Sequence, residues 1–507
     1  MRRELLIVFV AAVLLYVPTA WYGYVQDDRA IIVSNPAAHS VGAALGAFDD
    51  PYWPRESGAG LYRPVTILSF AIDWTLSGGR PGWLHLMNAL WHGVVTVLFV
   101  LVLMRWLPAL AAAGAGLIFA WHPVHVEAVA SIVGRAELLA AAGVLGAVLA
   151  ARRGAWLGAV LCAALAMFSK EHGVIAGVVI LLDRWLDSNQ AARPPAGFWI
   201  ALAAVTIGYV AIWAVVGVAG ASAPAAVFYG RHTFARLAIA LPAVLRATLL
   251  LFLPTSLSSD YGPQVIPAYT GISLAAILGL FMVIAVPVLV IACRRRAPAI
   301  SFATLIAALS FLPTSNLLFA GGIVLAERNL YLAVAVPAVL VGTLVRFVQS
   351  RTRAPMLVGA LVSIVCAALT LIRLPTWRDN RTQLLTLLEQ HPESYIGHAS
   401  AAAVLAGAGD TAGARDQYRI ADSLFAGDPY LDAARAIFLL NVGDTAGARP
   451  LVARVSARTE RAARRMALRA RFLLDLRRGD VAAARAVADS AAQGFPPDES
   501  WYRAYLQ

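Results

Sequence analysis

Two adjacent aspartates, Asp27 and Asp28, follow the first apolar segment of the chain within the stretch GYVQDDRAIIVSNP. Carboxylates beside a membrane helix are costly to desolvate and often functional. A carboxylate can take the proton of a hydroxyl group, and two side by side raise the pKa of one of them. A solvated turn is the alternative interpretation. The pair is therefore the first candidate for a functional site.

A second polar group lies in the stretch WHPVHVEAVASIVGRAELLA, which contains His122, His125, Glu127 and Arg135. Two histidines and a glutamate suit zinc by ligand type. Helical spacing from Pro123 does not place His125 and Glu127 on one face, however. We therefore predict no metal and expect these side chains to bind a phosphate or an acceptor, with His122 and His125 kept as alternative zinc ligands.

The only lysine of the chain, Lys170, lies in the stretch FSKEHG, where Glu171 and His172 follow it. All the other strongly basic residues are arginines, so a retained lysine suggests a site that needs a compact charge. The alternative is a pair that snorkels and neutralises itself at the membrane boundary.

Three more polar groups occur between apolar runs. The stretch LYRPVTILSFAIDW holds an arginine, PTSLSSDYGPQVIP an aspartate and a tyrosine, and AERNLYL a glutamate and an arginine. These candidate residues are Arg63, Asp260, Tyr261, Glu327 and Arg328. Each has a plausible structural role, but together they suggest a polar cavity at the bilayer surface.

Apolar segments must position these groups. The chain of 507 residues is 60% hydrophobic with a mean hydropathy of +0.71, and its apolar blocks approach the ~20 residues that cross a bilayer as a helix. The sequence therefore predicts an all-α polytopic membrane protein. The net charge of +12 does not indicate nucleic acid, because no basic cluster is interleaved with aromatic residues. The three cysteines fall inside predicted spans and form no paired framework. The predicted crossings lie near 5–21, 86–104, 107–121, 137–151, 154–168, 173–186, 197–219, 270–292, 298–313, 329–346 and 356–373.

Arginines in the short loops set the orientation. With eleven crossings, the basic loops share one side, which the positive-inside rule makes the cytoplasm. Residues 233–253 hold two arginines and a proline, so we predict an amphipathic or re-entrant helix at the outer interface, with a twelfth span as the alternative. The N-terminus is then cytoplasmic, and all the polar groups lie outside.

The region from residue 374 onward is rich in alanine and arginine and lacks long apolar runs. GDTAGAR occurs at 409–415 and again at 443–449, 34 residues later, and GDVAAAR follows at 479–485. This period is typical of tetratricopeptide repeats, which pair antiparallel helices. We therefore predict a short repeat domain over 374–507 after a membrane domain over 1–373.

These motifs occur in the order seen in the transmembrane-and-tetratricopeptide-repeat O-mannosyltransferases, which the chain resembles over essentially its whole length. HPVHVEA…GRAELL is the most specific match, and SKEHGV, SSDYGPQVIP and AERNLYL support it. The family is assigned to the GT-C glycosyltransferases, which use polyprenyl-phosphate sugars on the outer side of a membrane. His172 departs from the small residue usual after SKE, and the repeat array is short.

The resemblance implies transfer of mannose from a polyprenyl-phosphate donor to an acceptor hydroxyl, with inversion. Asp27 or Asp28 would be the base, and Glu127, Glu137, Glu171 and Glu327 would hold the cations that bind the phosphate. Preference for arginine over lysine indicates a GC-rich prokaryote and thus a bacterial-type member in the plasma membrane, with the repeats periplasmic or extracellular. An acceptor polypeptide could bind those repeats. The alternatives are a GT-C enzyme with another sugar or a lipid or glycan acceptor, and a non-enzymatic repeat scaffold.

Overall fold

The computed structural model describes residues 2–54, 60–187, 193–217, 224–267, 271–348, 354–458 and 461–494. The regular elements among these residues are helices, joined by turns and loops. An isolated bridge between Pro263 and Ile266 is the one β-type pairing in this part of the chain. The predicted all-α class is therefore confirmed for this part of the chain. Parts of the predicted outer loops, 55–59, 221–223 and 268–269, the end of the predicted crossing 197–219 and the last predicted repeat residues, 495–507, lie outside the described residues.

Seven helices among the described residues are long and apolar enough to cross a membrane, which makes the protein a multi-pass membrane protein. They are α1 with the turn after it (Arg2–Trp21), α4 (Pro81–Leu103), α7 with the turn before it (Ile132–Arg152), α10 with its extension (Ala196–Val216), α11 (Thr233–Phe252), α12 (Leu274–Cys293) and α15 with its extension (Met356–Trp377). A bent pair, α5 (Ala109–Trp121) and the segment Pro123–Ala130, adds an eighth candidate with a 49° break.

Shorter helices complete the bundle. They are α8 (Trp156–Ser169), α9 (Ala176–Leu186), α13 (Pro298–Phe311) and α14 (Ala335–Val348). Short helices could cross only as parts of a packed bundle, because each is below the length that spans the hydrocarbon core. The count of eleven crossings stays a prediction.

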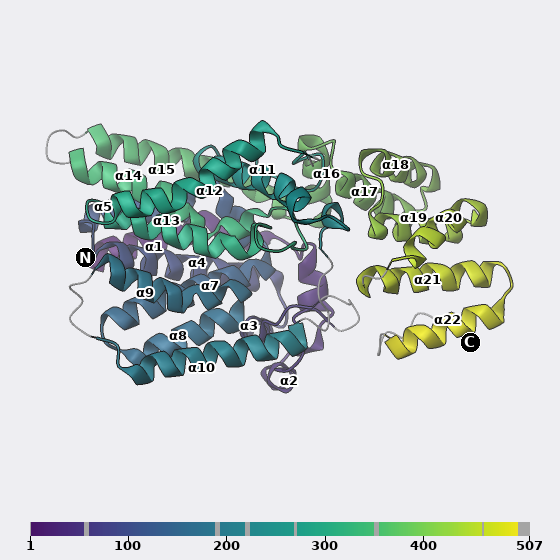
Figure 1. Ribbon diagram of the computed structural model, residues 1–507, viewed down its shortest axis with the longest axis horizontal. Helices are drawn as coiled ribbons and strands as arrows, with labels where there is room; N and C mark the ends of the chain where they lie inside the picture. Colours follow the sequence, from purple (N-terminus) through teal and green to yellow (C-terminus); the bar gives the residue numbers. More distant parts are fainter. Residues whose placement is uncertain are drawn as a thin grey trace.

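Helix α7 forms the centre of this bundle (Figure 1). Within its apolar window 94% of the residues are buried, against 11% for α10 and 17% for α12. Small residues allow the close packing, since a Cβ on Gly143 would lie 2.6 Å from the Cys162 carbonyl oxygen of α8. The outer helices therefore present apolar side chains to lipid, while α7 contacts protein.

One end of the bundle gathers the arginines that the positive-inside rule assigns to one side. Arg152 binds Asp183 through two nitrogens at 2.6 and 3.0 Å, and Arg105 pairs with Asp187. Arg294 lies over the Trp185 ring, 3.9 Å from its centroid. The ends of α4, α7, α9 and α12 therefore meet at the same end.

The C-terminal region forms three helix pairs next to the bundle, at the right of Figure 1. They are α17 (Tyr395–Gly407) with α18 (Thr411–Leu424), α19 (Pro429–Asn441) with α20 (Thr445–Ser456), and α21 (Arg461–Arg477) with α22 (Val481–Gly494). Each pair turns at a Gly-Asp step: the glycine has a φ of 76° to 84°, and the aspartate accepts a hydrogen bond from the backbone N–H three residues on. A separate apolar cluster, from Tyr395 to Ala488, holds these helices together.

Hydrogen bonds fix this region against the loops of the bundle. Helix α16 (Asn380–Gln390) begins beside the first loop, where the Gln26 N–H donates to Asn380 Oδ1 at 2.7 Å. The Gly23 N–H donates to the Arg378 carbonyl at 3.0 Å, and Gln264 donates to the Leu424 carbonyl at 2.8 Å. The helix pairs therefore lie at the end of the bundle that carries the first loop.

Candidate functional site

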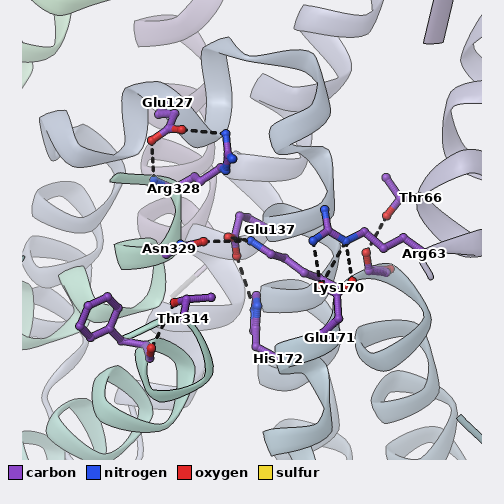
Figure 2. A network of polar contacts seen from close by, with 12 residues as sticks. Arg63, Thr66, Glu127, Glu137, Lys170, Glu171, His172, Thr314, Arg328 and Asn329 are labelled. Carbon is purple, nitrogen blue, oxygen red and sulfur yellow. Dashed lines mark hydrogen bonds and ion pairs between the residues drawn. The ribbon is translucent and has the colours of Figure 1, made fainter. Parts of the chain in front are cut away.

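Three ion pairs gather at that end of the bundle (Figure 2). Their side chains come from the residue before α3 (Pro64–Ser77), from α6 (Val126–Ala130) and α7, from the turn after α8, and from the turn Glu327–Leu330. The pairs are Arg63–Glu171, Lys170–Glu137 and Arg328–Glu127. Each predicted cation in this group is thus held by one of the predicted carboxylates.

Arg63 and Glu171 form a two-pronged pair. Nε of Arg63 lies 3.0 Å from Oε1 and Nη2 lies 2.8 Å from Oε2 of Glu171, and the guanidinium stands 4.8 Å from the Tyr52 ring centroid. Burial raises the pKa of Glu171, but Arg63 outweighs it and holds the pKa below its usual value. The Arg63 guanidinium is therefore fixed in direction and charged.

Lys170 pairs with Glu137 rather than with its neighbour Glu171. Its backbone is extended between α8 and the next turn, so adjacent side chains point apart (Figure 2). Nζ also lies 3.3 Å from Asn329 Oδ1, while Nε2 of His172 lies 3.5 Å from the second oxygen of Glu137. Burial, and then the charges of the two arginines nearby, lower the pKa of Lys170. The interpretation of Lys170 and Glu171 as a mutually neutralised pair is wrong.

Arg328 is the most exposed of these three cations, with 27% of its side chain accessible. Glu127 accepts from its backbone N–H and from Nη1, each at 2.9 Å. A guanidinium carries five N–H donors, and this carboxylate engages one of them. The pair therefore orients Arg328 while leaving its outer edge toward the loops.

The two aspartates of the first loop have different surroundings. Asp28 is fully buried, and its two oxygens accept hydrogen bonds from the backbone N–H groups of Val25, at 3.0 Å, and Val133, at 2.9 Å. Burial raises the pKa of Asp28 to about 7, although these hydrogen bonds oppose the shift. Asp28 thus ties the first loop to the second. Asp27 is partly exposed.

Tyr52 lies among the aspartates and the arginines. Burial raises the pKa of Tyr52, the charges of Asp27 and Asp28 raise it further, and those of Arg63 and Arg328 lower it. The pKa of this one hydroxyl depends on all four charges. The acidic pair and two of the cations therefore lie in one region. Candidate residues from the first loop and from the turn Glu327–Leu330 thus share this region.

Arg135 belongs to a different group. It is 1% exposed, donates to Asp73 Oδ2 at 2.8 Å and to the Leu84 carbonyl at 2.9 Å, and also binds Asn88 Oδ1. Asn88 in turn donates to three carbonyls of the loop before α7, at 2.9 to 3.2 Å. The structure therefore places Arg135 in a buried clamp, where its donors bind Asp73, Asn88 and the Leu84 carbonyl and none of the three site carboxylates.

His122 and His125 bind backbone carbonyls. Nε2 of His122 lies 3.1 Å from the Leu251 oxygen, and Nε2 of His125 lies 2.9 Å from the Tyr331 oxygen. His92 joins the same cluster through the Tyr331 hydroxyl at 2.7 Å. No group of three or more His, Cys, Asp and Glu side chains among the described residues is placed to hold a metal ion.

Glu327, Asp260 and Tyr261 join the loops to the helix pairs. Oε1 of Glu327 accepts from the Ser258 N–H at 2.6 Å and the Tyr261 hydroxyl at 2.8 Å, and burial raises the pKa of Glu327 to about 7. Asp260 accepts from the hydroxyl of Ser394, the residue that caps α17, at 2.7 Å. These contacts give the three residues a role in holding the loops and the helix pairs together.

Asp73 and Asn88 of the clamp, and His92 of the histidine cluster, were not predicted as members of any site. A signal was available, since Asn88 and His92 interrupt the apolar run WLHLMNALWH, and polar side chains inside a membrane helix usually have a defined partner.

The fold and the charged end of the bundle define a polytopic helical membrane protein with a polar site beside lipid-facing helices. Comparison with known proteins adds relatives by sequence. The chain is similar to mouse protein O-mannosyl-transferase TMTC3, 31% identical over 196 residues, which are 36% of this chain and 21% of that protein. It is also similar to F38B6.6 of Caenorhabditis elegans, 29% identical over 346 residues (65% of this chain, 49% of that protein), and to Tmtc2 of Drosophila melanogaster, 39% identical over 135 residues (25% and 14%).

These relatives carry the name of the family that the motifs of the chain resemble. The alignments span 14% to 49% of these three relatives' own length. No family model matches the chain, and no solved structure matches it significantly.

Proposed function

We propose that the protein transfers a hexose, with mannose as the first choice, from a polyprenyl-phosphate donor to a hydroxyl group of an acceptor polypeptide. One observation carries the proposal: three carboxylate-held cations stand beside an acidic pair at the end of a membrane bundle. A lipid phosphate with its tail in the bilayer would meet these cations. The relatives' names, protein O-mannosyl-transferases, support the choice of sugar and acceptor.

Arg63 and Arg328 are the groups that would stabilise the departing phosphate. Their side chains are 14% and 27% exposed, and each is already oriented by a carboxylate. Donors held in place before the reaction need no reorganisation as negative charge develops on the phosphate oxygen. Lys170, at 7% exposure, would act one layer deeper, by fixing Glu137 and Asn329.

Asp27 is the proposed general base. Asp28 is fully buried with both oxygens accepting backbone hydrogen bonds, so it positions the loop, whereas Asp27 is partly exposed toward the same region. In the proposed step, Asp27 takes the acceptor hydroxyl proton as the hydroxyl oxygen bonds to the anomeric carbon. The bond from that carbon to the phosphate oxygen breaks, and polyprenyl phosphate leaves. A single displacement of this kind inverts the anomeric carbon.

The proposed topology puts this site on the outer face of a plasma membrane, with eleven crossings and the N-terminus inside. Helix α11 would not cross. In support, the Ala225 N–H before it donates to the Gly321 carbonyl at 2.8 Å, and Leu251 near its end binds His122, so both flanks contact the loops of the site end. The helix pairs would form tetratricopeptide repeats that receive the acceptor polypeptide beside the site.

Purified protein incubated with polyprenyl-phosphate mannose and Ser/Thr peptides tests the proposal, with mass spectrometry for an added hexose. Donors with other sugars, and lipid or glycan acceptors, test the neighbouring GT-C activities. Asp27→Asn should lower the rate about 10²–10⁴-fold, the contribution of a positioned base. Asp416→Asn, on a repeat helix and 70% exposed, is the matched control. Absence of transfer from every donor would overturn the proposal in favour of a scaffold.

A further inference from the structure

A pocket of about 440 Å³ opens at the end of the bundle away from the candidate site. Its walls are the turn between α4 and α5, the end of α9 and the turn between α12 and α13. Helix α7 spans from one end to the other, and its 18 residues separate the two by about 27 Å at 1.5 Å per residue. The pocket is therefore distinct from the three ion pairs.

Positive charge is in excess in this pocket. Arg105, Arg294 and Arg295 line it together with one carboxylate, Asp187, which pairs with Arg105. Arg294 is held in place, since it lies 3.9 Å from the Trp185 ring centroid and its Nη2 lies 3.2 Å from the Trp185 carbonyl oxygen. Arg295 is exposed. A held guanidinium and an exposed one around the same pocket suit a phosphate group.

The approach to the pocket is apolar. The last turns of α12 expose Val288, Leu289 and Ile291, by 59%, 46% and 70%. Trp106 and Trp185 also line the pocket. Tryptophan is enriched at the boundary between hydrocarbon and headgroups, which fits a pocket at the end of the bundle. An acyl chain against α12 would thus bring its headgroup to Arg294 and Arg295.

We propose that this pocket binds the phosphate headgroup of an anionic phospholipid in the leaflet at that end of the bundle. Arginines that only set orientation need neither a concave site nor a stacked partner, and Arg294 has both. The proposal is independent of sugar transfer, because none of the pocket residues belongs to the candidate site.

Native mass spectrometry of the purified protein, titrated with phosphatidylglycerol in detergent, tests it. The double variant Arg294→Gln/Arg295→Gln should bind the lipid about 10–30-fold more weakly, as expected for two basic groups near an anionic headgroup. Arg296→Gln is the control: it removes one positive charge from the same turn, is exposed, and does not line the pocket. It should bind nearly as the unchanged protein does.

Further arms identify the ligand. Phosphatidylcholine, which has a phosphate but no net charge, should bind weakly, and inorganic phosphate at equal concentration should not displace phosphatidylglycerol. Equal losses in Arg296→Gln and the double variant, equal binding of phosphatidylcholine, or displacement by inorganic phosphate would each overturn the proposal. If the double variant unfolds at a lower temperature, Arg295→Gln alone replaces it. At this exposed position we expect a smaller loss of lipid binding in the same direction.

Discussion

Two groups of arginines paired with carboxylates lie at the same end of the bundle. They differ in how far the arginine side chains are exposed. Arg135 is 1% exposed, and its donors bind Asp73, Asn88 and a carbonyl. Arg328 and Arg63 are 27% and 14% exposed, and each is bound by one carboxylate. The first group holds helices together and the second orients charge toward an open region. Burial of the guanidinium, rather than the presence of an ion pair, separates a clamp from a candidate site.

The largest expected effect is on the clamp. Arg135→Gln leaves Asp73 as an unpaired charge in a buried position, which lowers the free energy of unfolding by about 3–5 kcal/mol. Thermal unfolding in detergent measures the change. An Arg135→Gln protein as stable as the unchanged one, yet inactive, would move Arg135 from the clamp to the site.

Arg328→Gln should instead reduce transfer, with a smaller loss of stability than Arg135→Gln. Loss of one oriented donor at the developing phosphate charge lowers the rate about 10²–10³-fold. Arg328 is 27% exposed, and Glu127, at 5% exposure, keeps the hydrogen bond from the backbone N–H of residue 328, so the loss of stability should be smaller than for the clamp. Parallel measurements of kcat and of unfolding temperature test both parts. A variant that unfolds early with a normal specific rate would contradict the comparison.

Lys170→Arg tests whether the lone lysine needs its compact shape. Nζ is enclosed by Glu137, Asn329 and the neighbouring arginines, and extra atoms in a packed site cost about 1–3 kcal/mol. We expect slower transfer with modest loss of stability. Arg63→Lys is the reverse control, because it keeps the charge and loses the two-pronged bond to Glu171. Normal rates in Lys170→Arg would show that the lysine has no special role.

Glu327 predicts a dependence of stability on pH. Its folded pKa of about 7 lies above the ordinary 4.5, so the protonated form favours the folded state. The contribution is fully present below the unfolded pKa and is lost as pH rises from about 4.5 to 7. Glu327→Gln should weaken this dependence, because a glutamine side chain does not titrate. Its amide oxygen can still accept from Ser258 and Tyr261, so the local hydrogen bonds are kept. Unfolding temperatures of the two proteins at pH 5 and pH 8 decide it.

Ser394→Ala should give the smallest change. It removes the hydroxyl that caps α17 and donates to Asp260, at about 0.5–2 kcal/mol for a helix cap. Limited proteolysis between the bundle and the repeats should detect the loosened contact. Ser423→Ala, an exposed serine of α18, is the control.

Much of the architecture could be predicted because apolar length and arginine position are local properties. The sequence predicted the helical class, basic loops on one side and paired helices after residue 374. The structure places Arg105, Arg152 and Arg294 at one end and turns each helix pair at a Gly-Asp step. The partner of Lys170 could not be predicted, because the extended backbone at that residue turns neighbouring side chains apart. The partners of Arg135 could not be predicted either, because Asp73 and Asn88 are 62 and 47 residues away along the chain.

Helix α7 also bears on how the protein would respond to bilayers of different thickness. It carries Glu137 at one end and Arg152 at the other, and 94% of its apolar window is covered by protein. A thinner or thicker bilayer acts on helices that lipid touches, by tilting them or stretching their boundary. Helices α10 and α12 would absorb that mismatch, so the spacing of charges around Glu137 is insulated from the thickness of the membrane.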